Sequence, residues 1–379
     1  MNRRLSGPIR QLKCLVVLII LCPAHISSAA PTTASIDASI RTSIDADKSV
    51  KAIEDFVTDQ VEKLASDDPE ARKSAREALV SNSTAPNATA SLQYLSRYAE
   101  VLDTHLQPLA THQNVVVRLN VAIVAERVAA NANNDRLRNV VLILLNDKNE
   151  AAIIWALKAS RYVIPAVLSN PLIAKNDKLL PSVVSIVQAH PSSSVILQEG
   201  YTALMLNYLD PNRAKPPPMI WKPMVASASG EVVKLLQWRL DMYRNGVPPD
   251  PLAEREPASF LVHPDIAGVQ SKDQRHVSAQ MICDLMSLAA LRVTTAAEAE
   301  KEPLINLVKR AANSILALAI VVDKDKANNL QQLNLPIQQA NKASPNLQAM
   351  VAAVCHALQK DIPALGVMPT TLPSTQPAH

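Results

Sequence analysis

Four side chains in the C-terminal third have the chemistry of a zinc site: His276, Cys283, Cys355 and His356. Two thiolates and two imidazoles are a common ligand set for Zn²⁺. His276 and Cys283, seven residues apart, can share one face of a helix, but the adjacent Cys355 and His356 point about a quarter-turn apart. The pattern therefore favours separate core and surface residues, and we predict neither a metal ion nor a cofactor.

Motifs that commonly mark catalysis are absent from the sequence. It contains no Gly-rich phosphate loop and no HExxH, GxSxG or CxxC motif. Sites assembled from distant residues leave no such trace, so an enzyme stays an alternative. We assign no catalytic residue and expect a protein that is not an enzyme.

Two tryptophans are the candidate partner-binding residues, because Trp often anchors protein interfaces. Trp155 precedes the small residue Ala156 in an apolar helical pattern, where it either anchors a partner or wedges between neighbouring helices. Trp221 follows a run of three prolines, which is typical either of a polyproline II recognition motif or of a linker with one buried Trp. The structural alternative is favoured for both residues.

The first 30 residues have the order of a secretory signal peptide. Four basic residues precede the apolar run at residues 14–22, and the small residues at 27–30 follow it. Cleavage is expected after Ala29 or Ala30. The run is shorter than the roughly 18 residues that a membrane span needs, so a retained anchor is disfavoured and no transmembrane helix is expected after cleavage. We therefore predict export to a periplasm or to the extracellular space.

Removing the leader changes both the charge and the cysteine count. The chain has 38 Lys and Arg against 34 Asp and Glu, and the leader holds four basic and no acidic residues, so the remainder is neutral. A phosphate-binding surface needs a lasting basic excess, which argues against nucleic acid as a partner. Two cysteines remain, Cys283 and Cys355, which are either buried thiols or, in an oxidising compartment, a disulfide.

A helical pattern recurs along residues 48–210. Residues 114–128 are its best copy, with valines spaced to stack on one helix face, while Arg118 and Glu126 are expected to face away. Four such helices open at Asp68, Asn114, Asn149 and His190, each preceded by an apolar helix. Their inner faces end in small or β-branched residues: Ala71/Ala75/Ala78, Val117/Val121/Val124, Ala152/Ala156/Ala159 and Ser193/Leu197/Gly200. Such residues let helices approach closely, so the unit is a helical hairpin.

These openings resemble HEAT-like (armadillo-type) repeats, whose second helix often begins Asp-Pro-x-Val-Arg-x-x-Ala. Residues 68–75 (DPEARKSA) are the nearest match; the copy at 114 keeps Val117 and Arg118, and the copy at 190 keeps only Pro191. The copy at 149 has neither the proline nor the arginine. The resemblance implies an α-solenoid that binds proteins, with no shared catalytic residue. Arg118 is then expected to bridge neighbouring turns.

The domain organisation follows from these patterns. Residues 1–30 are the signal peptide, 31–47 a disordered lead-in that does not pack, and 48–210 the repeat array. Proline-rich residues 211–229 form a connector, residues 230–362 a smaller C-terminal helical region, and residues 363–379 a disordered tail. Within the C-terminal region we expect helices at 230–243, 276–293, 303–322 and 345–360, and a surface loop at 247–268. The fold class is all-α.

Three functions fit the sequence. The first is an exported, non-enzymatic scaffold that binds protein partners through its helical-repeat surface. The second is a helical hydrolase acting on an envelope or matrix component, with its site between the array and the 230–360 segment. A pocket with converging carboxylates or a Ser/His pair would favour that reading. The third is a purely structural envelope protein.

Overall fold

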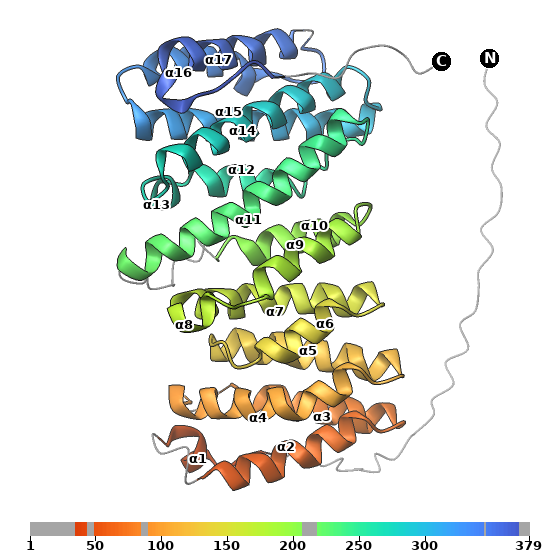
Figure 1. Ribbon diagram of the computed structural model, residues 1–379. Coiled ribbons are helices and arrows are strands. Elements are labelled where there is room, and N and C mark those ends of the chain that lie inside the picture. Colours follow the sequence, from red (N-terminus) through yellow and green to blue (C-terminus); the bar gives the residue numbers. More distant parts are fainter. Residues whose placement is uncertain (1–34, 44–48, 85–89, 207–217, 345, 371–379) are drawn as a thin grey trace, which may run out of the picture. The chain divides into compact units, whose positions relative to one another are not determined.

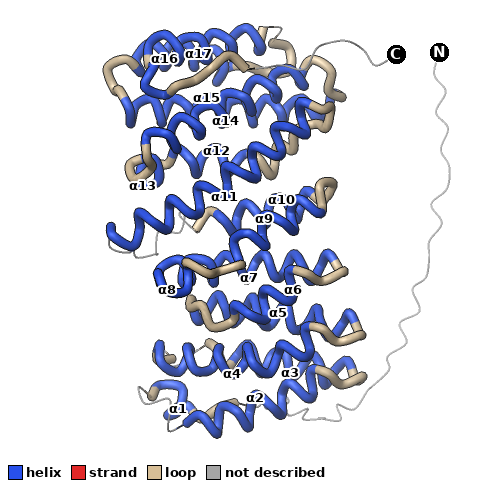
Figure 2. The backbone as a smooth tube through the Cα atoms, in the orientation of Figure 1, coloured by secondary structure: helices blue, strands red, loops and turns tan. Residues whose placement is uncertain are grey.

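The computed structural model describes residues 35–43, 49–84, 90–206, 218–344 and 346–370, and the predicted signal peptide lies outside them. Only helices and their connections occur in this part of the chain (Figure 1; Figure 2), which confirms the all-α prediction there. The helices before residue 207 are α1 (Ala38–Thr42), α2 (Val50–Leu64), α3 (Pro69–Ser81), α4 (Leu92–Ala110), α5 (Val115–Ala132), α6 (Arg138–Leu145), α7 (Glu150–Ser169), α8 (Pro171–Ala174), α9 (Leu179–Ala189) and α10 (Ser194–Leu204). Those after it are α11 (Pro218–Arg244), α12 (Arg255–Val262), α13 (Pro264–Ala267), α14 (Lys272–Val293), α15 (Glu298–Val322), α16 (Ala327–Gln339), α17 (Leu347–Asp361) and the short 3₁₀ helix η2 (Pro363–Leu365).

Four helix pairs occur where hairpins are expected: α2–α3, α4–α5, α6–α7 and α9–α10. Three of the second helices begin at the predicted cap, where the side chain of Asp68, Asn114 or Asn149 accepts a hydrogen bond from the first turn. The fourth begins later than predicted, at Ser194. Residues 190–193 close a turn instead, with the Ser193 N–H donating to the carbonyl of His190.

Successive hairpins contact one another through equivalent helices. The second helices α3, α5, α7 and α10 touch in that order, and the first helices α4, α6 and α9 do the same. The predicted small-residue face lies in these contacts, since Ala75, Val121 and Ala156 are fully buried. Short side chains at these positions allow the helix backbones to approach closely.

The same local arrangement precedes three of the second helices. Two residues before each cap, a side chain accepts a hydrogen bond from the cap's own N–H: Ser66 for Asp68, His112 for Asn114 and Asp147 for Asn149. The donor–acceptor distances are 3.1, 3.1 and 2.8 Å. A hydrogen-bonding side chain two residues before the cap thus recurs together with the capping side chain and fixes each helix entry.

Arg118 joins two of these turns, as expected. Its guanidinium donates to both carboxylate oxygens of Asp147 at 2.6 and 3.0 Å, and to the carbonyls of His112 and Gln113. The hydrogen bonds to Asp147 raise the pKa of Arg118. A bidentate salt bridge of this kind fixes the orientation of the two side chains as well as their distance. It therefore holds the turn before α5 against the turn before α7.

Glu126, expected to face away from the valine face of α5, is nevertheless buried. Its side chain is 8% exposed, because α5 is enclosed by α3, α4 and α7 and buries more than one face. Burial raises the pKa of Glu126, while Arg127, Arg161 and Lys158 oppose that shift. The acidic residue therefore belongs to the interface between α5 and α7.

Two segments expected to be disordered are partly ordered. In the lead-in, Ile36 is buried and its N–H donates to the Oδ1 atom of Asn82, while α1 packs on α4. In the tail, Leu365 is fully buried, and the Met368 N–H donates to the Gln280 side chain. In each segment a buried apolar side chain and a backbone hydrogen bond to another part of the chain contribute to this order.

Proline positions explain the other differences. Helix α11 begins at Pro218, inside the predicted connector, and α12 and α13 occupy most of the predicted loop at 247–268. Proline is tolerated in the first turn of a helix because the N–H that it removes would have no partner there. Pro264 is an example, opening α13. Helix α16 was not predicted.

Gly200 gives a test of the contact between α9 and α10. A Cβ atom added to Gly200 would lie 2.3 Å from Cγ2 of Val187. We expect Gly200→Ala to destabilise the protein by about 1–3 kcal/mol, because the overlap outweighs the higher helix propensity of alanine. In a Val187→Ala background the same change should cost nothing, since the clashing methyl is gone. Urea unfolding midpoints of the four proteins measure both effects, and a stabilising Gly200→Ala in the wild-type background would contradict this packing.

Candidate functional site

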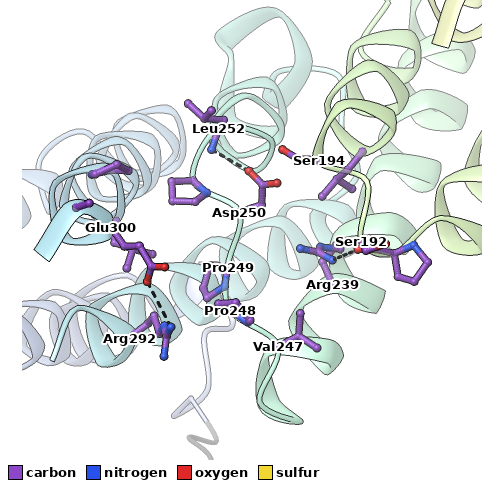
Figure 3. A pocket seen from close by; sticks show the side chains of 16 residues that line it. Ser192, Ser194, Arg239, Val247, Pro248, Pro249, Asp250, Leu252, Arg292 and Glu300 are labelled. Carbon is purple, nitrogen blue, oxygen red and sulfur yellow. Dashed lines mark hydrogen bonds and ion pairs between the residues drawn. The ribbon is translucent and has the colours of Figure 1, made fainter. Parts of the chain in front are cut away.

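An open cavity of about 530 Å³ lies between α10 and the helices that follow residue 218. Its walls come from the start of α10, the loop at residues 247–252, the end of α14 and the start of α15 (Figure 3). Ligand pockets commonly have volumes of about 300–1,000 Å³. The lining is mostly apolar, and it consists of Pro191, Ser192, Ser194, Leu197, Arg239, Val247, Pro248, Pro249, Asp250, Pro251, Leu252, Arg292, Ala299, Glu300, Pro303 and Leu304.

Arg239 supplies a buried charge to this cavity, with 3% of its surface exposed. Its Nε donates to Oε1 of Glu254 at 2.9 Å, and its Nη1 lies 3.4 Å from the carbonyl of Pro191. Its guanidinium also lies 5.0 Å from the ring centre of Tyr243. These contacts fix the guanidinium in one place, between α11 and the turn before α10.

Glu254, the partner of Arg239, is fully buried and accepts a second hydrogen bond from the Asp250 N–H at 2.7 Å. Burial raises the pKa of Glu254 to about 7, although Arg239 opposes the shift. The nearby Tyr201 hydroxyl is buried without a hydrogen-bond partner among the described residues, and burial raises its pKa well above the ordinary value.

The raised pKa of Glu254 predicts a pH dependence of stability. In the pH range between its unfolded value near 4.5 and about 7, Glu254 binds a proton in the folded state but not in the unfolded state. Its contribution to stability is therefore present at low pH and is lost as the pH rises through 7. Between pH 5 and 8 we expect wild type to lose about 2 kcal/mol more than Glu254→Gln, measured by urea unfolding. Parallel pH profiles for the two proteins would contradict this.

The two carboxylates that line the cavity are already engaged. Asp250 accepts hydrogen bonds from the N–H groups of Leu252 and Ala253, and Glu300 pairs with Arg292 at 3.4 Å. Figure 3 shows the Arg292–Glu300 pair on the side away from Arg239. The two carboxylates therefore serve a turn and an ion pair instead of converging on one point, and no histidine is among the lining residues described.

Trp155 lies outside this cavity, on α7. It is half-buried against the core, with the ammonium of Lys158 4.8 Å and the guanidinium of Arg127 5.8 Å from its ring centre. Arg127 belongs to α5, so the contact joins successive second helices. The partner-binding role of Trp155 stays a prediction.

Trp221 is also half-buried, near the start of α11. Its indole Nε1 lies 3.4 Å from the carbonyl of Asp265 in α13, and its ring packs against the core. This contact ties α11 to α13, and a partner-binding role for Trp221 likewise stays a prediction.

The structure brings Cys283 and Cys355 together but not the two histidines. The thiols are buried in α14 and α17, and the hydrogen bond between them, together with burial, raises the pKa of Cys283 well above its usual value. His276 instead lies against the carbonyl of Ala364, and His356 is exposed. Among the described residues, no group of three or more His, Cys, Asp or Glu side chains is placed to hold a metal ion.

Two helices, α7 and α15, are long and apolar enough to cross a membrane by length and composition. Within their most apolar windows, 61% and 50% of the residues are buried inside the protein. Core helices of soluble proteins pass the same test, so the expected absence of a membrane span stays a prediction.

None of the residues that line the cavity is predicted from the sequence to belong to a functional site. The residues come from segments up to about a hundred positions apart, and Arg239 and Glu254 carry no local motif that sets them apart. The one available signal was the group of prolines at 248, 249 and 251, which was interpreted as a surface loop. The hydrolase hypothesis placed its site between the array and the C-terminal helices, which is where this cavity lies.

No family model and no curated protein matches the sequence. One crystal structure described as an engineered protein aligns with a TM-score of 0.42 and 17% identity, over 83% of this chain and 71% of that chain. A second engineered protein aligns with a TM-score of 0.27 and 14% identity, over 80% and 97%. At these TM-scores, the alignments assign neither a family nor an activity.

Proposed function

We propose that the chain is an exported, non-enzymatic scaffold that holds a segment of a protein partner in the cavity beside α10. One observation carries the proposal: the cavity has apolar walls, and its two carboxylates are already engaged. Apolar concave sites with a few fixed polar groups are typical of binding. The neutral charge after residue 30 favours a protein partner over nucleic acid.

A HEAT-like solenoid is the proposed scaffold. The recurrent turn before α3, α5 and α7, the ordered contacts between second helices, and the bridge from Arg118 to Asp147 all support it. Stacked helical hairpins of this kind offer extended surfaces to partners. The α11–α17 region would then supply the second wall of the binding site.

The hydrolase alternative has less support. Glycoside hydrolysis uses two carboxylates on either side of one bond, and acyl transfer uses a nucleophile next to a base. Ser192 and Ser194 line the cavity without a histidine, and Asp250 and Glu300 have other partners. The capture experiment below distinguishes the proposed binding function from a purely structural role in the envelope.

Export is proposed on the pattern of residues 1–30. An oxidising compartment would then surround the domain, which is the condition under which Cys283 and Cys355 could pair. The compartment also decides which proteins can be partners, namely those of the periplasm or of the extracellular space.

Affinity capture with a filled cavity tests the function. The full chain is used to capture proteins from the exported fraction of its host as wild type, as Ser194→Trp and as Gln198→Trp. Ser194 is exposed and lines the cavity; Gln198, one turn further along α10, is also exposed and does not line it. We expect a partner that wild type and Gln198→Trp retain and that Ser194→Trp loses at least about tenfold, since one blocked anchor pocket can cost 2 kcal/mol or more. Equal recovery by all three proteins, or recovery by none, would contradict the proposal.

A further inference from the structure

We infer that the cavity binds the free C-terminal carboxylate of a partner polypeptide that ends in apolar residues. The inference rests on the proposed function and names the part of the partner that is recognised. It follows from the hydrogen-bonding groups that the cavity leaves open and from the apolar surface around them.

The first open donor is the guanidinium of Arg239. Nε is used by Glu254 and by the Tyr243 hydroxyl, and Nη1 faces Pro191. Nη2 donates to no described residue, although only 3% of Arg239 is exposed and the residue lines the cavity. Arginine is well suited to carboxylate recognition, because its donors lie in a fixed plane.

The second group of donors is the first turn of α10. Its cap residue, Ser193, makes no side-chain hydrogen bond to the turn, unlike Asp68, Asn114 and Asn149 at the earlier openings. The N–H groups of residues 194–196 therefore have no acceptor in the described chain. An uncapped helix N-terminus favours an anion through these N–H groups and through the helix dipole.

The carboxylates beside the cavity are, by contrast, partly in use. Asp250 accepts from two backbone N–H groups, Glu254 accepts from Arg239 and from the Asp250 N–H, and Glu300 pairs with Arg292. A ligand that pairs with the open donors of Arg239 and α10 must bring acceptors, and a carboxylate brings two oxygens with several lone pairs.

The remaining walls suit an apolar chain next to that carboxylate. Leu197 and Leu304 are buried at the cavity wall, Leu252 is 59% exposed at its edge, and prolines from three segments surround them. Proline lacks an N–H group, so these walls offer contact surface with few backbone donors. An apolar C-terminal residue would bury against them while its carboxylate meets Arg239 and α10.

Matched peptide pools test the inference on the full chain. Both pools are N-acetylated pentapeptides with mixed Leu, Ile, Val, Phe and Ala at the last two positions; one ends in a carboxylate and the other in an amide. Peptide retained on the immobilised protein is measured by mass spectrometry. We expect at least about tenfold more acid than amide to be retained, the usual scale of a hydrogen bond to a charged group. Ser194→Trp should abolish the difference, and Gln198→Trp should keep it.

Equal retention of the two pools, or an acid preference that survives in Ser194→Trp, would overturn the inference. Decanoate is tested in parallel, because it carries the same carboxylate on an apolar chain without a peptide. Retention of decanoate without retention of the acid pool would also overturn it, in favour of a free fatty acid. If the pools fail while Ser194→Trp still loses the captured protein partner, the proposed function stands and only the carboxylate inference fails.

Discussion

Arg239→Met is expected to lower the free energy of unfolding by about 3–5 kcal/mol at pH 8. The substitution leaves Glu254, which is fully buried, without its cationic partner. An unpaired buried carboxylate must either stay charged at high cost or take up a proton, and both reduce stability near pH 8. At pH 5 Glu254 is already protonated, since burial raises its pKa to about 7, so the cost there should be smaller.

Two variants control for this prediction. Arg310→Met removes an arginine whose partner, Glu256, is partly exposed, and it should cost less than about 1 kcal/mol. Arg239→Met combined with Glu254→Met removes both charges and should recover most of the loss. Urea unfolding at pH 5 and pH 8 measures all of these proteins. If the single variant Arg239→Met is as stable as Arg310→Met, the ion pair between Arg239 and Glu254 does not stabilise the fold around the cavity.

A disulfide between Cys283 and Cys355 is the second large effect that we expect. Both thiols are buried, and Cys355 is near enough to raise the pKa of Cys283. Joining them would close a loop of roughly 70 residues, which corresponds to a stabilisation of about 4 kcal/mol in the chain-entropy account. Oxidised glutathione would take up the two electrons and two protons. The oxidised protein should melt at a higher temperature than the reduced one and should lack both thiols on alkylation after unfolding.

Cys355→Ser controls for the effect of the oxidant itself, because this variant cannot form the bond and its melting temperature should not respond. The alternative, in which both cysteines act only as buried apolar residues, makes the opposite prediction. In that case both thiols of the oxidised wild type would react fully with the alkylating reagent once the chain is unfolded.

The second helices could be predicted because their signals are local. A capping side chain followed by buried residues at helical spacing fixes both the start and the inner face of α3, α5 and α7. The start of α10 was misplaced because Pro191 resembles a first-turn proline, whereas residues 190–193 form a turn. Helix α16 did carry a readable pattern, with buried residues at 330, 334 and 337, but its polar composition and Pro336 obscured it.

Neither the burial of Glu126 nor the cavity could be predicted from the sequence. The helical spacing of apolar residues identifies one buried face of a helix. Helix α5 is covered on several sides, so its neighbouring helices determine whether an acidic residue such as Glu126 is buried. The cavity depends on Arg239 meeting Glu254 and on α10 meeting α15, and these contacts between distant segments leave no periodic trace. Capping and periodicity therefore predicted the helices, whereas tertiary packing determined the candidate site.

The most direct test of the central claim is photo-cross-linking from the edge of the cavity in the full chain, expressed in its own host. A photoreactive phenylalanine replaces Leu252, which is 59% exposed and lines the cavity, or Leu335 on α16, which is 49% exposed and does not line it. We expect a discrete protein adduct from position 252, none from position 335, and loss of the adduct when Ser194→Trp fills the cavity. No adduct from position 252, or an adduct that persists with the cavity filled, would contradict the claim that this chain binds its partner there.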